Sequence, residues 1–223
     1  MKKIITPILM GLGLLMLSMS LNAQTARVQI IHNSPDLLAD TVDIYINQAA
    51  TPAIDDFVFR SATGFLDLPA GVALEIGVAE ATSSGPQDID GSVTIPALTA
   101  GETYIAIASG VFIPTLYDQT ANGPAIAFDL DILTPAREAG VGADVDLAVF
   151  HGAPDVDSVD ILVANAGGAT LIDDLGYGTF QGYASVAPGK YILDITPYND
   201  NGTTVISYFV DLSGLGGGSA TVF

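Results

Sequence analysis

The stretch HNSPDLLADTVDIYIN (residues 32–47) decides the fold, because HGAPDVDSVDILVAN (residues 151–165) repeats it later in the chain. The flanking segments repeat as well, with Val28–His32 matching Leu147–His151 and Asp55-Asp56 matching Asp173-Asp174. A spacing of 117 to 119 residues relates the matched positions. Repetition at a nearly constant spacing indicates a tandem duplication of one domain.

Each copy is predicted to consist of strands, because short segments rich in β-branched and aromatic residues alternate with turn residues. Within residues 42–47, Val and Ile alternate with Asp43, Tyr45 and Asn47, so one face of this strand should meet the core and the other water. We predict an all-β chain of two tandem antiparallel β-sandwich domains, immunoglobulin-like or transthyretin-like, with roughly seven to eight strands each. A barrel is the alternative.

The domain boundaries follow from composition. Residues 134–143 combine Pro, Gly and two charges without an apolar pattern and are predicted to be a linker between repeat 1 (residues 24–133) and repeat 2 (residues 144–223). The final GGGSATVF aligns with AGETYIAI of repeat 1, so repeat 2 stops before the counterpart of AIAFDLDI. We expect repeat 2 to be truncated, with an uncovered sheet edge.

The first 23 residues have the layout of a signal peptide. Lys2 and Lys3 precede an apolar run that ends near Leu21, and Ala23 supplies the small residue before a predicted cut at Gln24. An uncleaved anchor is the alternative, since about 20 apolar residues span a bilayer. We expect a secreted or cell-surface protein with no membrane insertion after cleavage.

Charge and cysteine content limit the partners and the chemistry. Beyond the signal peptide, 25 acidic residues face four basic ones, Arg27, Arg60, Arg137 and Lys190. Proteins bind phosphate backbones through Lys and Arg, so we expect no nucleic-acid partner. The chain has no Cys, which excludes disulfides, cysteine catalysis and cysteine metal sites.

The repeated His-x-x-Pro-Asp is interpreted as a structural motif formed by His32 and Pro35 in repeat 1 and by His151 and Pro154 in repeat 2. Each His closes the apolar stripe of a strand, and the Pro-Asp that follows is typical of a turn. A half-buried imidazole can tie such a turn down through a ring nitrogen.

The repeated acids support a calcium hypothesis. Carboxylate and carbonyl oxygens in loops are hard ligands that suit calcium better than zinc, although the spacing is not that of an EF-hand. The candidate ligands are Asp36, Asp40, Asp43, Asp155, Asp157 and Asp160. Calcium is therefore the one cofactor that we consider.

No catalytic residues are predicted. Ser34 lies beside His32, as in a Ser-His-Asp set, but repeat 2 has Ala153 at the equivalent position. Many acids could form a glycosidase pair, but no pair stands out. The candidates for sugar stacking are tyrosines, because the chain has no Trp: Tyr45, Tyr117, Tyr177, Tyr183 and Tyr198.

The segments RVQIIHNSPDLLADTVDIYIN, DDFVFRSATGFLDLPAG and GETYIAIASG resemble the secreted bacterial repeat family called domain of unknown function 4397. Repeat 2 departs from the pattern, because Gly152-Ala153 replaces Asn33-Ser34 and Leu162 replaces Tyr45. The resemblance implies exported tandem domains and supplies no activity that can be carried over to particular residues.

Together these observations predict a secreted or cell-surface, non-catalytic structural or adhesive interaction module. Its expected partner is an extracellular protein or glycan. A calcium-stabilised glycan-binding module is the alternative, and a glycoside hydrolase ranks last.

Overall fold

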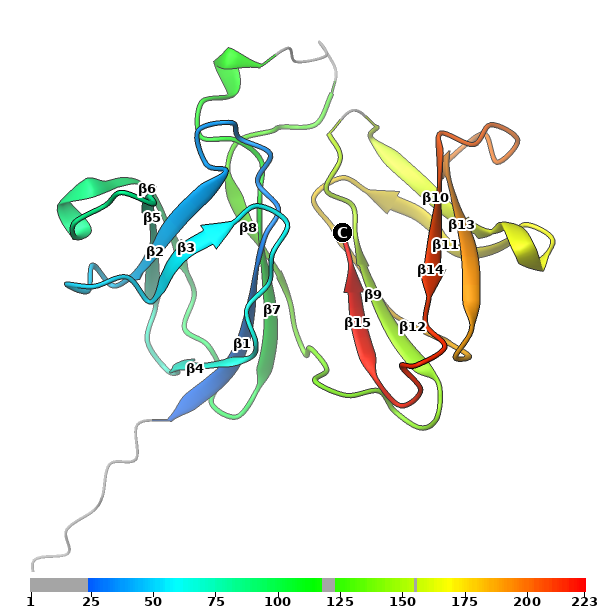
Figure 1. The fold of residues 1–223 in the computed structure, drawn as a ribbon, viewed down its shortest axis with the longest axis horizontal. Helices are drawn as coiled ribbons and strands as arrows, with labels where there is room; N and C mark the ends of the chain where they lie inside the picture. The colour runs from blue at the N-terminus through cyan, green and yellow to red at the C-terminus, as the bar shows by residue number, and fades with distance from the viewer. Residues whose placement is uncertain (1–23, 118–122, 155) are drawn as a thin grey trace, which may run out of the picture.

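The computed structural model describes residues 24–117, 123–154 and 156–223. The predicted signal peptide and Asp155 lie outside the described residues. Two β-sandwiches lie side by side, one formed by each repeat (Figure 1). No helix in the described part of the chain has the length and apolar character needed to cross a membrane.

Repeat 1 is built from two four-stranded sheets. In spatial order, one sheet contains β4 (Leu66–Pro69), β1 (Thr25–His32), β7 (Thr103–Ser109) and β8 (Asp129–Leu133). The other contains β3 (Ile54–Val58), β2 (Thr41–Ile46), β5 (Leu74–Glu80) and β6 (Ile89–Ile95). Short 3₁₀ turns, η1 (Pro86–Asp88) and η2 (Pro114–Leu116), lie in the connections.

Repeat 2 has the same topology in its described residues, with one strand fewer. Its smaller sheet contains β12 (Phe180–Val186), β9 (Val145–Phe150) and β15 (Ser219–Val222). The larger sheet contains β11 (Ala169–Gly176), β10 (Ser158–Val163), β13 (Lys190–Pro197) and β14 (Ile206–Asp211). The 3₁₀ turn η3 (Ala164–Ala166) follows β10.

The predicted all-β, tandem-sandwich fold is confirmed, with a refinement of the strand directions. The first strand of each repeat pairs in parallel with a late strand, β1 with β7 and β9 with β15, while the other described pairs are antiparallel. Strand β4 was not predicted, because its four residues end in Pro69 and carry a weak strand signal.

The segment after β7 closes the core of repeat 1. In repeat 1, Phe112 and Phe128 stack with ring centroids 4.4 Å apart, and with Leu130 of β8 they pack against the core. The described residues of repeat 2 supply no counterpart of β8. In repeat 2, Ile206 and Tyr208 on β14 are about half exposed, at 46% and 53%.

A separate apolar cluster joins the two repeats. Ile31 of β1 and Ile107 of β7 point away from the core of repeat 1 and are fully buried against Ala136 of the linker and Phe150 of β9. Both faces of β1 and β7 are therefore covered, one by the sandwich core and the other by the domain junction. The two domains are packed together.

Candidate functional site: the repeated acids and the domain junction

The two His side chains of the repeated motif are buried in equivalent loops. Nε2 of His32 donates to the carbonyl oxygen of Ala39 at 2.7 Å, and Nε2 of His151 donates to that of Val156 at 2.9 Å. Desolvation by burial lowers the pKa of both rings, and the hydrogen bond to the carbonyl opposes this only in part. The neutral rings hold these loops against the ends of β1 and β9.

The buried carboxylate of Asp36 holds the motif loop in place. One carboxylate oxygen accepts hydrogen bonds from the Leu38 N–H and the Tyr117 hydroxyl, and the other accepts one from the Phe112 N–H. Burial acts to raise the pKa of Asp36, but these three donors outweigh it and hold the pKa below its usual value. Both oxygens are thus used in connecting the motif loop to the segment after β7.

Asp43 and Asp160 occupy equivalent buried positions on β2 and β10, each opposite a β-bulge. Oδ1 of Asp43 accepts the N–H of Asp56 at 3.0 Å, and Oδ1 of Asp160 accepts that of Asp174 at 2.7 Å. Asp56 and Asp174 have φ angles of 51° and 52°, in the left-handed region that Asp tolerates better than most residues. Asp43 and Asp160 therefore each stabilise a β-bulge in the neighbouring strand.

The second carboxylate oxygen distinguishes the repeats. Oδ2 of Asp43 accepts the hydroxyl of Ser83, whose oxygen also lies 2.7 Å from the Tyr45 hydroxyl. Oδ2 of Asp160 is buried and has no hydrogen-bond partner among the described residues. The prediction that Tyr45 faces water is wrong: it is 1% exposed and bonded to Ser83, whose loop covers this end of β2.

The remaining candidate ligands lie apart from these carboxylates. Asp40 and Asp157 are exposed, and their main-chain carbonyls accept the N–H groups of Phe59 and Tyr177. Within the described residues, Asp160 is the one candidate ligand that belongs to a group of acids able to share an ion. Its partners are Asp173 and Asp174, and the three carboxylates place oxygens within 4.8 Å of one another.

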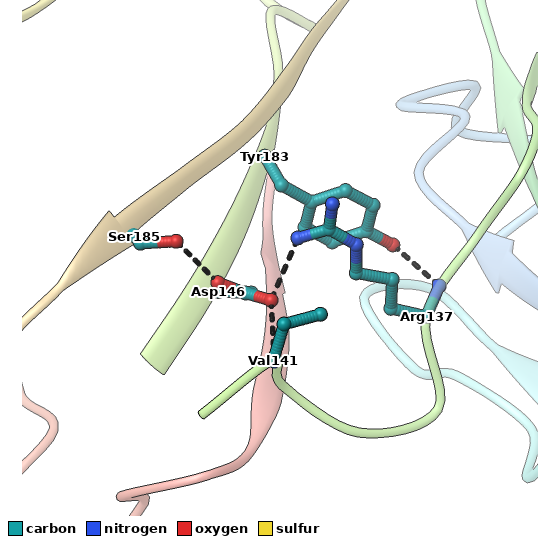
Figure 2. Close-up of polar contacts among 5 residues, drawn as sticks. All are labelled: Arg137, Val141, Asp146, Tyr183 and Ser185. Atoms are coloured by element: carbon teal, nitrogen blue, oxygen red, sulfur yellow. Dashed lines mark hydrogen bonds and ion pairs between the residues drawn. The ribbon is translucent and has the colours of Figure 1, made fainter. Parts of the chain in front are cut away.

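The domain junction contains a fully buried carboxylate, that of Asp146 on β9 (Figure 2). It accepts hydrogen bonds from the Arg137 guanidinium at 2.7 Å, the Val141 N–H at 2.9 Å and the Ser185 hydroxyl. The bonds from Ser185 and Val141, supported by Arg137, hold the pKa of Asp146 below its usual value against the effect of burial. Two of the three donors belong to the linker.

Arg137 is itself fixed by repeat 2. Its guanidinium lies 4.5 Å from the centroid of the Tyr183 ring, and its main-chain N–H donates to the Tyr183 hydroxyl at 2.8 Å (Figure 2). A cation over an aromatic face adds attraction to the ion pair with Asp146. The linker is therefore bound to the surface of repeat 2.

The next linker residue, Glu138, binds repeat 1. Its carboxylate accepts two hydrogen bonds from the Arg27 guanidinium, at 2.9 and 3.0 Å. Arg27 on β1 and Asp146 on β9 immediately precede the matched positions Val28 and Leu147, so they are equivalent residues of opposite charge. Two adjacent linker residues of opposite charge thus bind the equivalent residue of each domain: Glu138 binds Arg27 of repeat 1, and Arg137 binds Asp146 of repeat 2. We call Arg137 and Glu138 the linker staple.

A mixed polar and apolar crevice of about 260 Å³ adjoins the staple. Side chains from both repeats and the linker line it, including Gln29, Phe65, Glu138, Thr221 and Phe223. Neither the staple nor this crevice was predicted from the sequence. The one available signal was the opposite charge of Arg27 and Asp146 at the start of otherwise matched strands.

Comparison with known proteins gives one clear relationship. A family model described as a domain of unknown function, DUF4397, matches residues 26–126 and 145–221, which is most of the chain in two tandem copies. A search of the curated proteins found no match. A solved structure described as alpha-glucan binding by a streptococcal virulence factor is 9% identical, covers 83% of this chain and 88% of that one, and has a TM-score of 0.26. So low a score carries no argument about function.

The buried His rings predict a pH dependence of stability. Their pKa in the unfolded chain is about 6.5, and burial lowers it in the folded protein, so the unfolded state binds more protons as the pH falls. Stability should be complete above pH about 6.5 and should fall as the pH drops through the folded-state pKa. The measurement is the midpoint of thermal unfolding from pH 7.5 to 5. The double variant His32→Gln/His151→Gln keeps an N–H donor and should show a flatter profile, whereas a flat wild-type profile would contradict the prediction.

The staple predicts a specific stability loss for Arg137→Gln. Asp146 would stay buried without its cation, which should lower the free energy of unfolding by about 1.5 kcal/mol. This value is at the lower end for a hydrogen bond to a charged group, because water screens the partly exposed Arg137. Denaturant unfolding measures this loss. Arg60→Gln removes the same charge from an exposed side chain and should change stability by less than about 0.5 kcal/mol. Equal effects of the two variants would show that net charge, and not the staple, is responsible.

Proposed function

This chain belongs to the DUF4397 family, and from that premise we propose that it is a secreted or cell-surface, non-catalytic structural or adhesive module. The two domains act as one rigid unit that presents a binding surface at a fixed distance from its point of attachment. The expected partner is an extracellular protein or glycan.

The observation that carries this proposal is the linker staple over an apolar junction. Arg137 binds Asp146 in repeat 2 and Glu138 binds Arg27 in repeat 1, while Ile107 and Phe150 are buried between them. Fixing two domains in one orientation suits a spacer or adhesive unit, because avidity depends on binding surfaces held where they can engage together.

Exposed apolar side chains on repeat 2 supply a candidate contact surface. Phe209 on β14 is 67% exposed, and its cross-strand partner on β13, Ile192, is 42% exposed, so these two side chains lie on the same face of the sheet. Exposed aromatic side chains can stack on sugar rings or enter the pocket of a protein partner. The acidic surface around them keeps an exported protein soluble and disfavours anionic partners.

A calcium-stabilised glycan-binding module is the second candidate. It is favoured by the junction crevice, where Phe65 and Phe223 provide apolar surface and Gln29 and Glu138 provide hydrogen-bonding groups. A site that combines apolar walls with a few polar groups suits a small polar ligand.

Export predicts a defined mature N-terminus. When the full chain is expressed in cells that export it, the protein should appear outside the cytoplasm and begin at Gln24. N-terminal sequencing of the exported protein measures this directly, with Ala23→Arg as the variant that should block cleavage at that bond. A full-length protein beginning at Met1 in the cytoplasm would contradict the proposed location.

Adhesion is tested with beads carrying residues 24–223 and a panel of glycan-coated and protein-coated surfaces. We expect retention on at least one surface and an about tenfold loss for Ile192→Ser/Phe209→Ser, since an exposed aromatic side chain and its apolar neighbour contribute heavily to binding. Leu37→Ser/Leu38→Ser is the matched control, because it removes exposed apolar side chains from repeat 1. No retention on any surface, or hydrolysis of a polysaccharide or peptide at enzyme-like rates, would overturn the proposal.

A further inference from the structure

The surroundings of the equivalent carboxylates Asp43 and Asp160 can be compared residue by residue, because the strand registers match. Asp43 on β2 pairs with Ala79 on β5, and Asp160 on β10 pairs with Thr196 on β13. The turns that follow β5 and β13 also match: the Ser83 N–H donates to the Glu80 carbonyl, and the Asp200 N–H donates to the Pro197 carbonyl. Asp200 therefore occupies in repeat 2 the position of Ser83 in repeat 1.

This exchange removes the hydroxyl of Ser83, which donates to the carboxylate in repeat 1, and the hydroxyl of Tyr45, which contacts Ser83. Asp200 replaces Ser83, and Leu162 replaces Tyr45, so neither replacement offers a proton to Asp160. The hydroxyl of Thr196, directly across from Asp160, donates instead to Oδ1 of Asn201 at 3.1 Å.

The Asp160 side chain is 99% buried. Its Oδ2 therefore has no hydrogen-bond partner among the described residues. A buried carboxylate oxygen without a donor is costly, and the charges of Asp173 and Asp174 within 4.8 Å add repulsion. A bound cation would remove both penalties. We propose that repeat 2 binds one calcium ion between Asp160, Asp173 and Asp174, whereas in repeat 1 the Ser83 hydroxyl satisfies the equivalent Asp43.

The chemistry of the group selects calcium. Its side chains offer carboxylate oxygens without His or Cys, which disfavours zinc. Two oxygens that bind the same calcium ion at about 2.3–2.6 Å can be separated by up to about 5 Å, which accommodates the observed spacing, and water completes the 6–8 ligands. Asp173 and Asp174 are exposed, so the ion can enter from solvent and should bind at about 10⁻⁴ to 10⁻³ M, as in extracellular modules.

The first test is calcium binding to the whole mature chain. Calorimetric titration at constant ionic strength should show one site in the range given above, and 10 mM CaCl₂ should raise the midpoint of thermal unfolding by roughly 4 °C relative to chelator. MgCl₂ at the same concentration should have a much smaller effect. No binding at 10 mM, or equal effects of the two salts, would overturn the site in favour of water or a diffuse ion atmosphere.

Matched variants locate the site. Asp173→Asn should weaken calcium binding at least about tenfold, the loss expected when a charged ligand is removed. Asp55→Asn changes the equivalent exposed acid of repeat 1 and should leave binding within about twofold. Asp160→Asn retains an oxygen to accept the Asp174 N–H, so it should fold and lose calcium binding. Equal losses for Asp173→Asn and Asp55→Asn would overturn the assignment to repeat 2.

Discussion

The arrangement of the two domains depends on the buried carboxylate of Asp146. A charge without water must be compensated, and here the linker supplies Arg137 and the N–H of Val141. The same linker extends Glu138 to Arg27 of repeat 1. A segment with Gly and charged residues, of a composition typical of flexible linkers, is thereby bound to both domains. The apolar junction around Ile107 adds to this arrangement, because separating the domains would break the Glu138–Arg27 pair and expose this cluster to water.

Duplication preserved the backbone while the side-chain partners diverged. Both repeats keep the neutral His that ties down the motif loop and the Asp that holds a bulge. The repeats differ in the side chains at other equivalent positions. Repeat 1 has Arg27 where repeat 2 has Asp146, and it has Ser83 where repeat 2 has Asp200. These exchanges alter what surrounds a site without altering the strand register that positions it. One fold can therefore serve as support in one copy and as a binding unit in the other.

Strand alternation and the repeat predicted the sandwich fold, because both depend on local pattern and spacing. The same alternation predicted wrongly that Tyr45 faces water. A loop that returns over the outer face of the sheet buries Tyr45, and Ser83 of this loop, 38 residues away, forms a hydrogen bond with it. It also could not reveal that Ile107 faces a second domain. The repeated acids were recognised, but their grouping was not. Asp160 joins Asp173 and Asp174 through pairing of β10 with β11, whereas the sequence neighbour Asp157 stays exposed. Cross-strand contacts of this kind have no signature in sequence spacing.

Two differences between the repeats leave groups of repeat 2 unsatisfied where repeat 1 has partners for them. Repeat 1 covers its core with Phe112, Phe128 and β8, and the Ser83 hydroxyl satisfies Oδ2 of Asp43. Repeat 2 exposes Tyr208 on the inner side of β14 and leaves an oxygen of Asp160 unpaired. Exposed apolar area and an unpaired buried charge both lower stability unless something binds them, and any such ligand stabilises the fold by mass action.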